Sequence, residues 1–248
     1  MHPSFSRTDH RPWPLPQKRW QSRQTWHDLL FAHWPVAASD VRSLVPESLD
    51  IQEFAGSSWV GVVPFHMTGV ARRSLPDIPG LSAFPELNLR LYVERDGRPG
   101  VWFLSLDASN PFAVWVARRF FALPYYRAKI SVVSSGDGIQ YRCTRRASGR
   151  PVRFSAEYGP TSKVYEAKPG SLEYFLTERY CLYAQAKNGR VLRTEIHHVP
   201  WPLQEARANI EINELHVPHG FQISGPPSTL HFARRLDVVV WRPEVVEP

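Results

Sequence analysis

The sequence predicts a strand-rich α+β domain whose sheet is mainly antiparallel and closes in the manner of a barrel. Three observations predict this fold class. Strand-like segments outnumber helical ones along the 248 residues, and most connections between them read as hairpins. Hydrophobic residues make up 43% of the chain and aromatic residues 12%, which is enough for a sizeable core. Residues 1–24 are polar, basic and proline-containing, and we expect them to form a flexible arm before a single domain over residues 25–248.

The first elements of the domain are a short helix and a strand. A helix is expected over residues 40–49, where Ser39 or Asp40 can cap its first turn. Residues 57–67 alternate as a strand does, and Pro64 within them predicts an edge strand or a bulge, since proline cannot donate to a sheet.

Residues 86–107 give the clearest pattern, that of a hairpin closed by the turn "RDGRPG". Side chains of its first strand alternate between two faces, with Leu87, Leu89 and Leu91 on one and Glu86, Asn88 and Arg90 on the other. If the leucines pack under other elements, the polar trio faces the interior of the barrel.

A helix is expected over residues 110–123, directly after the hairpin. Asn110 is a suitable N-cap, Pro111 suits the first helical position, and Pro124 ends the helix. The apolar residues of this predicted helix include Phe112, Val116, Phe120 and Leu123.

The second half of the chain again favours strands. Strands are expected near residues 128–134, 139–145, 152–158 and 236–243. Residues 169–184 read as a short helix, capped near Ser171, that runs into a strand, and Asn188–Gly189 turns this strand into residues 190–199. Residues 200–211 are expected to form a last helix.

The formal charge of +7 raises the question of a polyanionic partner. The basic residues occur near the N-terminus and in scattered pairs, without a block of like charges or an RNA-binding aromatic motif. Nucleic acid is therefore not the expected partner, and an arginine-rich surface explains the charge.

Other compositional features restrict the class of protein. Cys143 and Cys181 lack the spacing of a zinc site or a disulfide framework. Neither a leader segment nor a long apolar run is evident, so we expect a cytoplasmic protein without a membrane partner. No nucleotide or nicotinamide fingerprint and no hydrolase motif occurs, and no cofactor is expected.

Four stretches resemble the YqjF-like family of bacterial proteins of unknown function: "PELNLRLYVERDGRPGVWFLSLDASN", "ALPYYRAKI", "PGSLEYFLTERYCLYA" and "IHHVPWPL". They are long, occur in order and spread over residues 26–205. That family is similar in turn to the acetoacetate decarboxylase-like superfamily. The resemblance implies a cone-shaped antiparallel β-barrel with flanking helices, an interior pocket and a homo-oligomer.

The superfamily pattern places a glutamate on a strand and, after a hairpin and a helix, a Gly-aromatic-Pro-Lys-Lys motif. Glu86 occupies the glutamate position and Pro124 matches the proline, but Tyr125 and Tyr126 replace the two lysines. In the decarboxylases one lysine forms a Schiff base, and its cationic neighbour lowers its pKa. Tyrosine cannot form an imine, so the decarboxylase mechanism does not transfer.

Lys129 is the lysine nearest to Tyr125 and Tyr126, and it is the candidate to replace the missing motif lysines. It lies about 10 Å beyond the tyrosines if the segment is extended, and it alternates onto the face of Tyr125 and Arg127. It is retained as a candidate ligand-binding residue, and the alternative is a solvated lysine at a strand edge.

The polar trio supplies the central hypothesis about function. Glu86 is the candidate base or acid, and Arg90 can bind a carboxylate with its planar fork, with Asn88 between them. The alternative is that Glu86 and Arg90 form a structural ion pair.

Two further groups complete the candidate site. Either Tyr125 or Tyr126 can present its hydroxyl to the pocket, or both rings can pack in the core. Arg179 is a second candidate anion contact, or a structural partner of Glu86 or Glu173.

The histidine pairs do not favour a metal site. His197 and His198 are adjacent on a predicted strand and therefore point to opposite faces. His216 and His219 have a tolerable spacing, but no carboxylate or cysteine completes the set. No metal is expected, and one of the adjacent histidines can face the pocket.

Together these features predict a protein that binds a small aromatic or carboxylate-bearing molecule inside its barrel. Acid–base chemistry by Glu86 and a tyrosine, without a Schiff base, is the leading interpretation. The alternatives are a ligand-binding protein without turnover and a basic protein that contacts polyanions.

Overall fold

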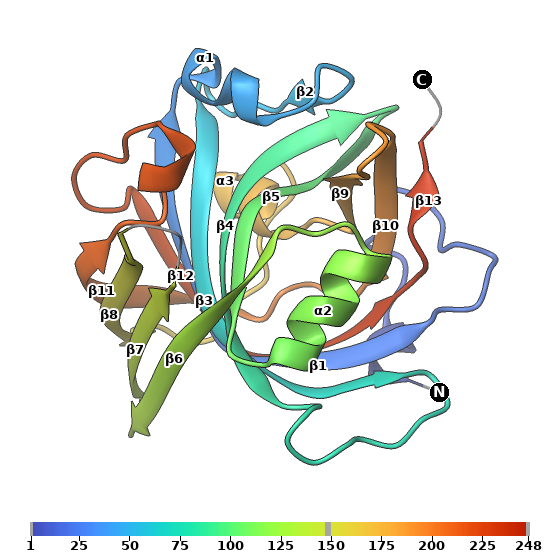
Figure 1. Ribbon diagram of the computed structural model, residues 1–248, viewed down its shortest axis with the longest axis horizontal. Helices are drawn as coiled ribbons and strands as arrows, with labels where there is room; N and C mark the ends of the chain where they lie inside the picture. The colour runs from blue at the N-terminus through green and yellow to red at the C-terminus, as the bar shows by residue number, and fades with distance from the viewer. Residues whose placement is uncertain (1, 147–149, 247–248) are drawn as a thin grey trace.

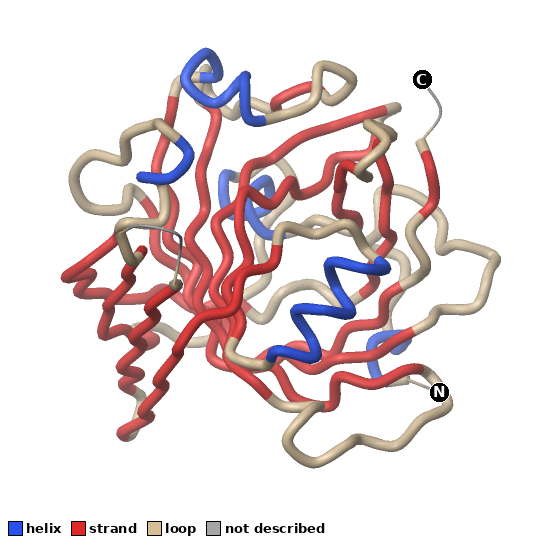
Figure 2. The backbone as a smooth tube through the Cα atoms, viewed as in Figure 1, coloured by secondary structure: helices blue, strands red, loops and turns tan. Residues whose placement is uncertain are grey.

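The computed structural model describes residues 2–146 and 150–246. Residue 1 of the predicted arm and residues 247–248 of the predicted domain lie outside the described part. The strands are β1 (Ser22–Val36), β2 (Asp50–Ile51), β3 (Ser58–Arg72), β4 (Phe84–Arg95), β5 (Arg98–Ala108), β6 (Tyr125–Ser135), β7 (Gly138–Arg145), β8 (Val152–Pro160), β9 (Cys181–Gln185), β10 (Val191–His197), β11 (Leu203–Asn213), β12 (Thr229–Val240) and β13 (Glu244–Val245). The helices are α1 (Ala38–Val41), α2 (Pro111–Phe120) and α3 (Leu172–Thr177), with 3-10 turns η1 (Pro3–Ser6), η2 (Arg42–Leu44) and η3 (Val217–His219) (Figures 1 and 2).

The strands close into two rings that share the sheet β12–β1–β3–β4–β5. From β5 the first ring continues through β6, β7, β8 and β11 to β12, and the second continues through β9 and β10 to β12. In Figure 1 the first ring extends to the left of β5 and the second to the right. The expected strand-rich α+β fold is confirmed, although β5 pairs with β6 and with β9 in parallel rather than antiparallel.

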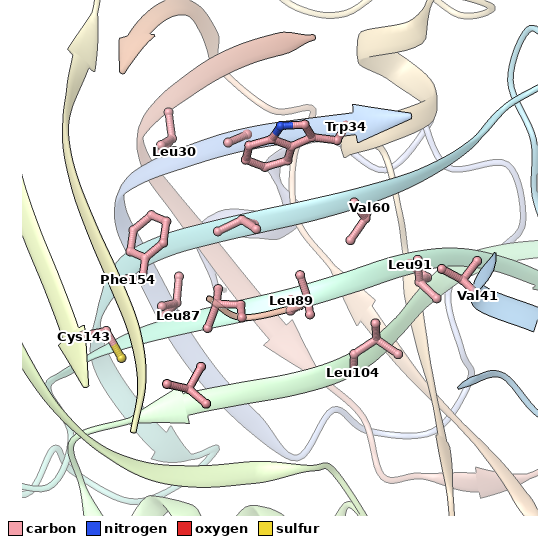
Figure 3. Packing of buried hydrophobic residues seen from close by; sticks show 14 of the residues in the cluster. Leu30, Trp34, Val41, Val60, Leu87, Leu89, Leu91, Leu104, Cys143 and Phe154 are labelled. Carbon is pink, nitrogen blue, oxygen red and sulfur yellow. The ribbon is translucent and has the colours of Figure 1, made fainter. Parts of the chain in front are cut away.

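The shared sheet is buried on both faces, so its strands carry two different sets of side chains. One face points into the first ring, where the β4 leucines pack with Leu30, Trp34 and Phe154 (Figure 3). The opposite face carries a second apolar cluster that includes Phe31 and Phe65. Because Glu86, Asn88 and Arg90 alternate with the leucines on β4, they lie on this opposite face, inside the second ring.

Pro64 lies in the middle of the sheet rather than at its edge, since β3 pairs with both β1 and β4. The register between β1 and β3 shifts between His27 and Ala32, in the stretch of β1 that faces Pro64. The predicted bulge is therefore confirmed and the predicted edge position is wrong. A bulge interrupts the regular ladder, and this is one of the places where a sheet tolerates proline.

The helix predicted over residues 40–49 is shorter and begins earlier. α1 starts after Ala37, which makes no side-chain capping bond, so neither Ser39 nor Asp40 is the cap. Val45 already has extended dihedral angles, φ −122° and ψ 134°. It precedes Pro46, and a residue before proline disfavours the helical conformation.

Asn110 caps α2 as expected, because its Oδ1 accepts hydrogen bonds from the backbone of Phe112 and Ala113 at 3.0 and 3.2 Å. Two of the apolar residues named for this segment face outward, since Phe112 and Phe120 are 54% and 58% exposed, and Val114 is the buried residue of the helix. The helix packs on the second apolar cluster through Val114, which leaves its aromatic side chains outward.

The helix predicted over residues 200–211 is also wrong, because residues 203–211 of this segment lie in strand β11. Its side chains alternate in burial along the strand, and Ala206, Ala208 and Ile210 pack against the core of the first ring. A period of two in burial is typical of a strand with one covered face. The other predicted strands, the helix at Ser171 and the turn at Asn188–Gly189 are confirmed as α3, β6 to β10 and β12.

The N-terminal segment, predicted as a flexible arm, contacts the outside of the second ring. Arg11 and Trp13 donate hydrogen bonds to Glu195 Oε2 at 3.0 and 2.8 Å, and His197 Nε2 lies 2.9 Å from the carbonyl of Ser4. Strand β1 begins at Ser22, within the predicted arm. The division of the chain into an arm and one domain stays a prediction. In the described residues no helix has the length and apolar character needed to span a membrane.

Candidate functional site

Glu86 and Tyr125 meet inside the second ring. β4 carries Glu86, and Tyr125 is the first residue of β6, where it pairs with Leu106 of β5. The Tyr125 hydroxyl donates a hydrogen bond of 2.5 Å to Glu86 Oε2. Leu106 N donates a backbone hydrogen bond of 3.1 Å to Pro124 O. This bond fixes the position of the residue directly before Tyr125, at the end of the segment that connects α2 to β6.

The carboxyl group of Glu86 has an unusual protonation equilibrium because only 3% of the residue is exposed. Burial raises its pKa from 4.5 to about 8, the Tyr125 hydrogen bond opposes this, and the nearby charge of Asp107 adds to it. Burial also raises the pKa of Tyr125 well above its ordinary value. At neutral pH Glu86 is therefore mostly a neutral acid that can donate a proton.

Asn88 lies between Glu86 and Arg90 on the same face of β4 and is 4% exposed. Its Oδ1 has no hydrogen-bond partner within the described part of the chain. Buried polar atoms nearly always have a partner, so an orphaned amide oxygen in this position favours contact with a ligand or an ordered water.

Arg90 extends the site toward a buried tyrosine. Its Nε donates to Tyr92 Oη at 3.1 Å and its Nη2 donates to Leu176 O at 3.3 Å. His33 Nε2 lies 2.6 Å from the same tyrosine hydroxyl. A Cβ on Gly61 would lie 3.0 Å from His33 Nε2 and 3.2 Å from Tyr92 Oη, so glycine leaves room for this contact.

Arg179 approaches the same tyrosine from the segment after α3. Its guanidinium carbon lies 5.1 Å from the centre of the Tyr92 ring, and its Nε donates to Phe175 O at 2.7 Å. Its Nη1 donates to Gln52 Oε1. Burial lowers the pKa of Arg179 to about 10, which leaves it charged at neutral pH.

Neither arginine forms an ion pair with an acidic residue of the described segments. The alternative of a structural Glu86–Arg90 pair is therefore wrong, and so is a link from Arg179 to Glu86 or Glu173. Two buried cations without a carboxylate are costly in an apolar interior unless an anion or other hydrogen-bond acceptors compensate them. The pair of Arg90 and Arg179 can accept a negatively charged ligand.

Tyr126 and Lys129 are not brought to this site. The Tyr126 ring lies 4.2 Å from the guanidinium carbon of Arg145, because alternation along β6 directs it away from Tyr125. Lys129 is exposed on β6, opposite Thr144 of β7. Their roles in ligand binding or catalysis stay predictions.

Sequence reasoning missed several buried polar residues. Tyr92 continues the alternation of Glu86, Asn88 and Arg90 by one more step, and that period could have identified it. Asp107 and Arg145 form a buried ion pair, with two contacts of 2.7 Å between the guanidinium and the carboxylate. They are far apart in the sequence, so no local pattern indicates the pairing.

His197 and His198 both lie within hydrogen-bonding distance of backbone carbonyl groups. His198 Nε2 lies 3.3 Å from Arg179 O, and burial lowers the pKa of His197 and His198 to about 4 and about 3. Within residues 2–146 and 150–246, no three His, Cys, Asp or Glu side chains are grouped so that they could hold a metal.

This arrangement of strands is the fold of acetoacetate decarboxylase-like proteins. The acetoacetate decarboxylase of Legionella pneumophila superposes with a TM-score of 0.62 at 15% identity, over 96% of this chain and 93% of the other. An acetoacetate decarboxylase-like enzyme of Sphingomonas wittichii gives 0.62 at 11% identity over 93% and 94%. The enduracididine biosynthesis enzyme MppR, complexed with pyruvate, gives 0.61 at 12% identity over 96% and 93%.

Sequence comparison identifies the family within this fold. The model of the DUF2071 family, described as "Uncharacterized conserved protein (COG2071)", matches residues 23–237. The "Uncharacterized protein YqjF" of Bacillus subtilis is 44% identical over 227 residues, which cover 92% of this chain and 93% of the relative. The chain belongs to this YqjF-like family, as the sequence motifs indicated.

Proposed function

We propose that the protein binds a small carboxylate-bearing organic molecule in the second ring and acts on it by acid–base chemistry with Glu86 and Tyr125. The observation that carries this proposal is the 2.5 Å hydrogen bond from Tyr125 to a buried Glu86 whose pKa lies at about 8. A pKa near the working pH suits a group that must both give and take a proton. Tyr125 stands where the superfamily pattern has lysine, so the chemistry proceeds without an imine.

The opposite end of the site supports a carboxylate on the ligand. Arg90 lies four residues along β4 from Glu86, which separates their Cα atoms by about 13 Å. Arg90 and Arg179 together provide a planar, charged recognition surface for an anion. Asn88, between the two ends, offers an unpaired oxygen to a donor on the ligand.

MppR binds pyruvate, as its structure's description states, and this makes 2-oxo acids the first compounds to try. In its ionised form, Glu86 can take the proton from the carbon next to the oxo group, which leaves an enolate, and after exchange with the solvent the carboxylic acid returns a deuteron to the same carbon. Exchange of that carbon-bound hydrogen for deuterium measures this chemistry before the natural substrate is known.

The test is an exchange assay in deuterated buffer with pyruvate, longer 2-oxo acids and aromatic oxo acids, followed by proton NMR. We expect the protein to accelerate exchange for one class and Glu86→Gln to abolish it. Glu157→Gln, on the exposed face of β8, is the control and should match the parent. Undiminished exchange by Glu86→Gln contradicts the catalytic assignment.

Binding is measured separately on the same compounds by thermal shift, since a ligand at a hundred times its dissociation constant adds about 2.7 kcal/mol. If a compound binds, if Arg90→Met weakens this binding, and if no protein concentration accelerates hydrogen exchange, the protein is a ligand-binding protein without turnover. Stabilisation only by oligonucleotides, lost at high salt, identifies the polyanion alternative. The expected homo-oligomer and cytoplasmic location stay predictions.

A further inference from the structure

The edge of β5 has a gap between its two parallel partners. β5 pairs with β9 at Val101 and Trp102 and with β6 at residues 106–108. Residues 103–105 take part in neither of these pairings. The sheet therefore forks at this point, as one partner leads into the first ring and the other into the second.

A pocket of about 220 Å³ lies at this fork. Most of its lining residues are apolar or aromatic by type, among them Trp102 and Phe103 from β5, Tyr183 from β9 and Pro124 from the segment before β6, and Gln185 and His219 add polar side chains. An apolar cavity of about 150 Å³ is large enough for benzene. The fork pocket, as we call it, therefore has room for one aromatic ring with a small substituent.

The polar atoms of the aromatic wall already have partners inside the protein. Trp102 Nε1 donates to Leu44 O at 2.9 Å, and Tyr183 Oη donates to Arg98 O at 2.8 Å. These bonds hold the two rings in place, and the partly buried Trp102 ring supplies the larger aromatic contact surface for a ligand, since Tyr183 is almost fully buried.

His219 is the exception in the wall of the fork pocket. Its Nε2 is buried and has no hydrogen-bond partner within the described part of the chain. Burial, helped by the charge of Arg145, lowers the pKa of His219 to about 4, so the ring is neutral at physiological pH. Leu215 and Phe221 on either side of η3 are buried in the core of the first ring, which fixes the loop that carries this imidazole.

We propose that the fork pocket binds a small uncharged aromatic molecule with a ring hydroxyl, which hydrogen bonds to His219 Nε2. A hydroxyl group both donates and accepts, so it matches either tautomer of a neutral imidazole. No Asp, Glu, Lys or Arg of the described residues lines the pocket, which favours a neutral ligand. The site is separate from the Glu86 site, whose polar residues do not line it.

The test compares two probes of nearly equal shape, 4-fluorophenol and 4-fluorotoluene, by fluorine NMR titration of the full chain. The hydroxyl probe should bind the parent protein about two- to tenfold more tightly, the effect of one hydrogen bond. His219→Leu should remove this preference, and His66→Leu, a half-buried histidine on β3 outside the pocket, should retain it. The position is checked through the Trp102 indole N–H resonance, assigned by its loss in Trp102→Phe, which should shift with the probe.

Failure of both probes to bind, or equal binding of both to the parent, overturns the proposal. Retention of the preference in His219→Leu also overturns it, as does a Trp102 resonance that the bound probe leaves unmoved. If His219→Leu proves unfolded by its thermal transition, His219→Gln replaces it. That variant keeps a polar group and should lower the preference without removing it.

Discussion

Glu86 and Asp107 are buried carboxyl groups on adjacent strands, yet they point into different rings and have different partners. Asp107 lies opposite Leu87 in the first ring, where Arg145 binds it through two contacts of 2.7 Å. Glu86 lies in the second ring and has a tyrosine hydroxyl as its hydrogen-bond donor. Burial raises the pKa of both groups, and Arg145 opposes this only at Asp107. Asp107 is therefore a carboxylate that stabilises the fold, whereas Glu86 is an acid that is free to exchange its proton.

Loss of the Asp107 carboxylate should have the largest effect on stability. Asp107→Asn leaves Arg145 buried without its counter-ion, and we expect a decrease of about 3–5 kcal/mol in the free energy of unfolding. Urea denaturation at pH 7 measures it. Asp77→Asn, from the half-exposed pair with Arg23, is the matched control and should change stability by about 1 kcal/mol or less. A similar small loss at Asp107 would contradict its structural role.

The pH dependence of stability should distinguish Glu86 from an ordinary carboxylate. The folded state keeps a proton on Glu86 up to about pH 8, whereas the unfolded chain releases it near 4.5. The stability that the protonated group contributes is present below pH 4.5 and is lost as the pH rises toward 8. We expect Glu86→Gln to become more stable than the parent across this range, by at most about 1.4 kcal/mol per pH unit. If the free energy of unfolding of the two proteins varied with pH in the same way, the pKa of Glu86 would not be raised in the folded state.

Removal of the Tyr125 hydroxyl should have a smaller effect on stability. Tyr125→Phe deletes the hydrogen bond that lowers the pKa of Glu86, so this pKa should rise further and unfolding should become easier by about 1 kcal/mol. Tyr126→Phe keeps the ring that packs on Arg145 and serves as the control. Equal behaviour of the two variants, in denaturation curves at pH 6 and pH 9, would contradict the assignment of Tyr125.

Lys129→Met should have the smallest effect of all. Lys129 is exposed on β6, and substitution of such a surface residue changes stability by about 0.5 kcal/mol or less. Borohydride reduction in the presence of pyruvate, followed by mass spectrometry, should give no adduct on either protein. An adduct that disappears in Lys129→Met would restore the Schiff-base mechanism.

The elements that could be predicted are those in which local signals agree. The β4–β5 hairpin has a period of two and an Asp-Gly turn, and α2 has an Asn-Pro start. The strand β11 was missed because alanine, glutamate and arginine favour a helix, although the alternation of Ala206, Ala208 and Ile210 is that of a strand. In this case a tertiary contact overrides the local preference.

The candidate site could be predicted only in part. The glutamate, the arginine and the two tyrosines were identified from alternation and from the family resemblance. The choice between Tyr125 and Tyr126 depends on where α2 ends and β6 begins, and a shift of one residue reverses it. Partnerships such as Asp107 with Arg145 join distant parts of the chain, and no pattern within a short window contains them.

Both rings are closed by strand β12, which lies near the end of the chain, so neither ring can close until late in synthesis. The first and second rings each return to it, and it pairs with β1, which was made about 200 residues earlier. A ribosome adds about 5–20 residues per second, so β1 waits of order ten seconds or more for this partner while the β4–β5 hairpin can form at once. During that wait the edge of β1 is open to other chains, and any nascent chain that stops before Thr229 keeps it open.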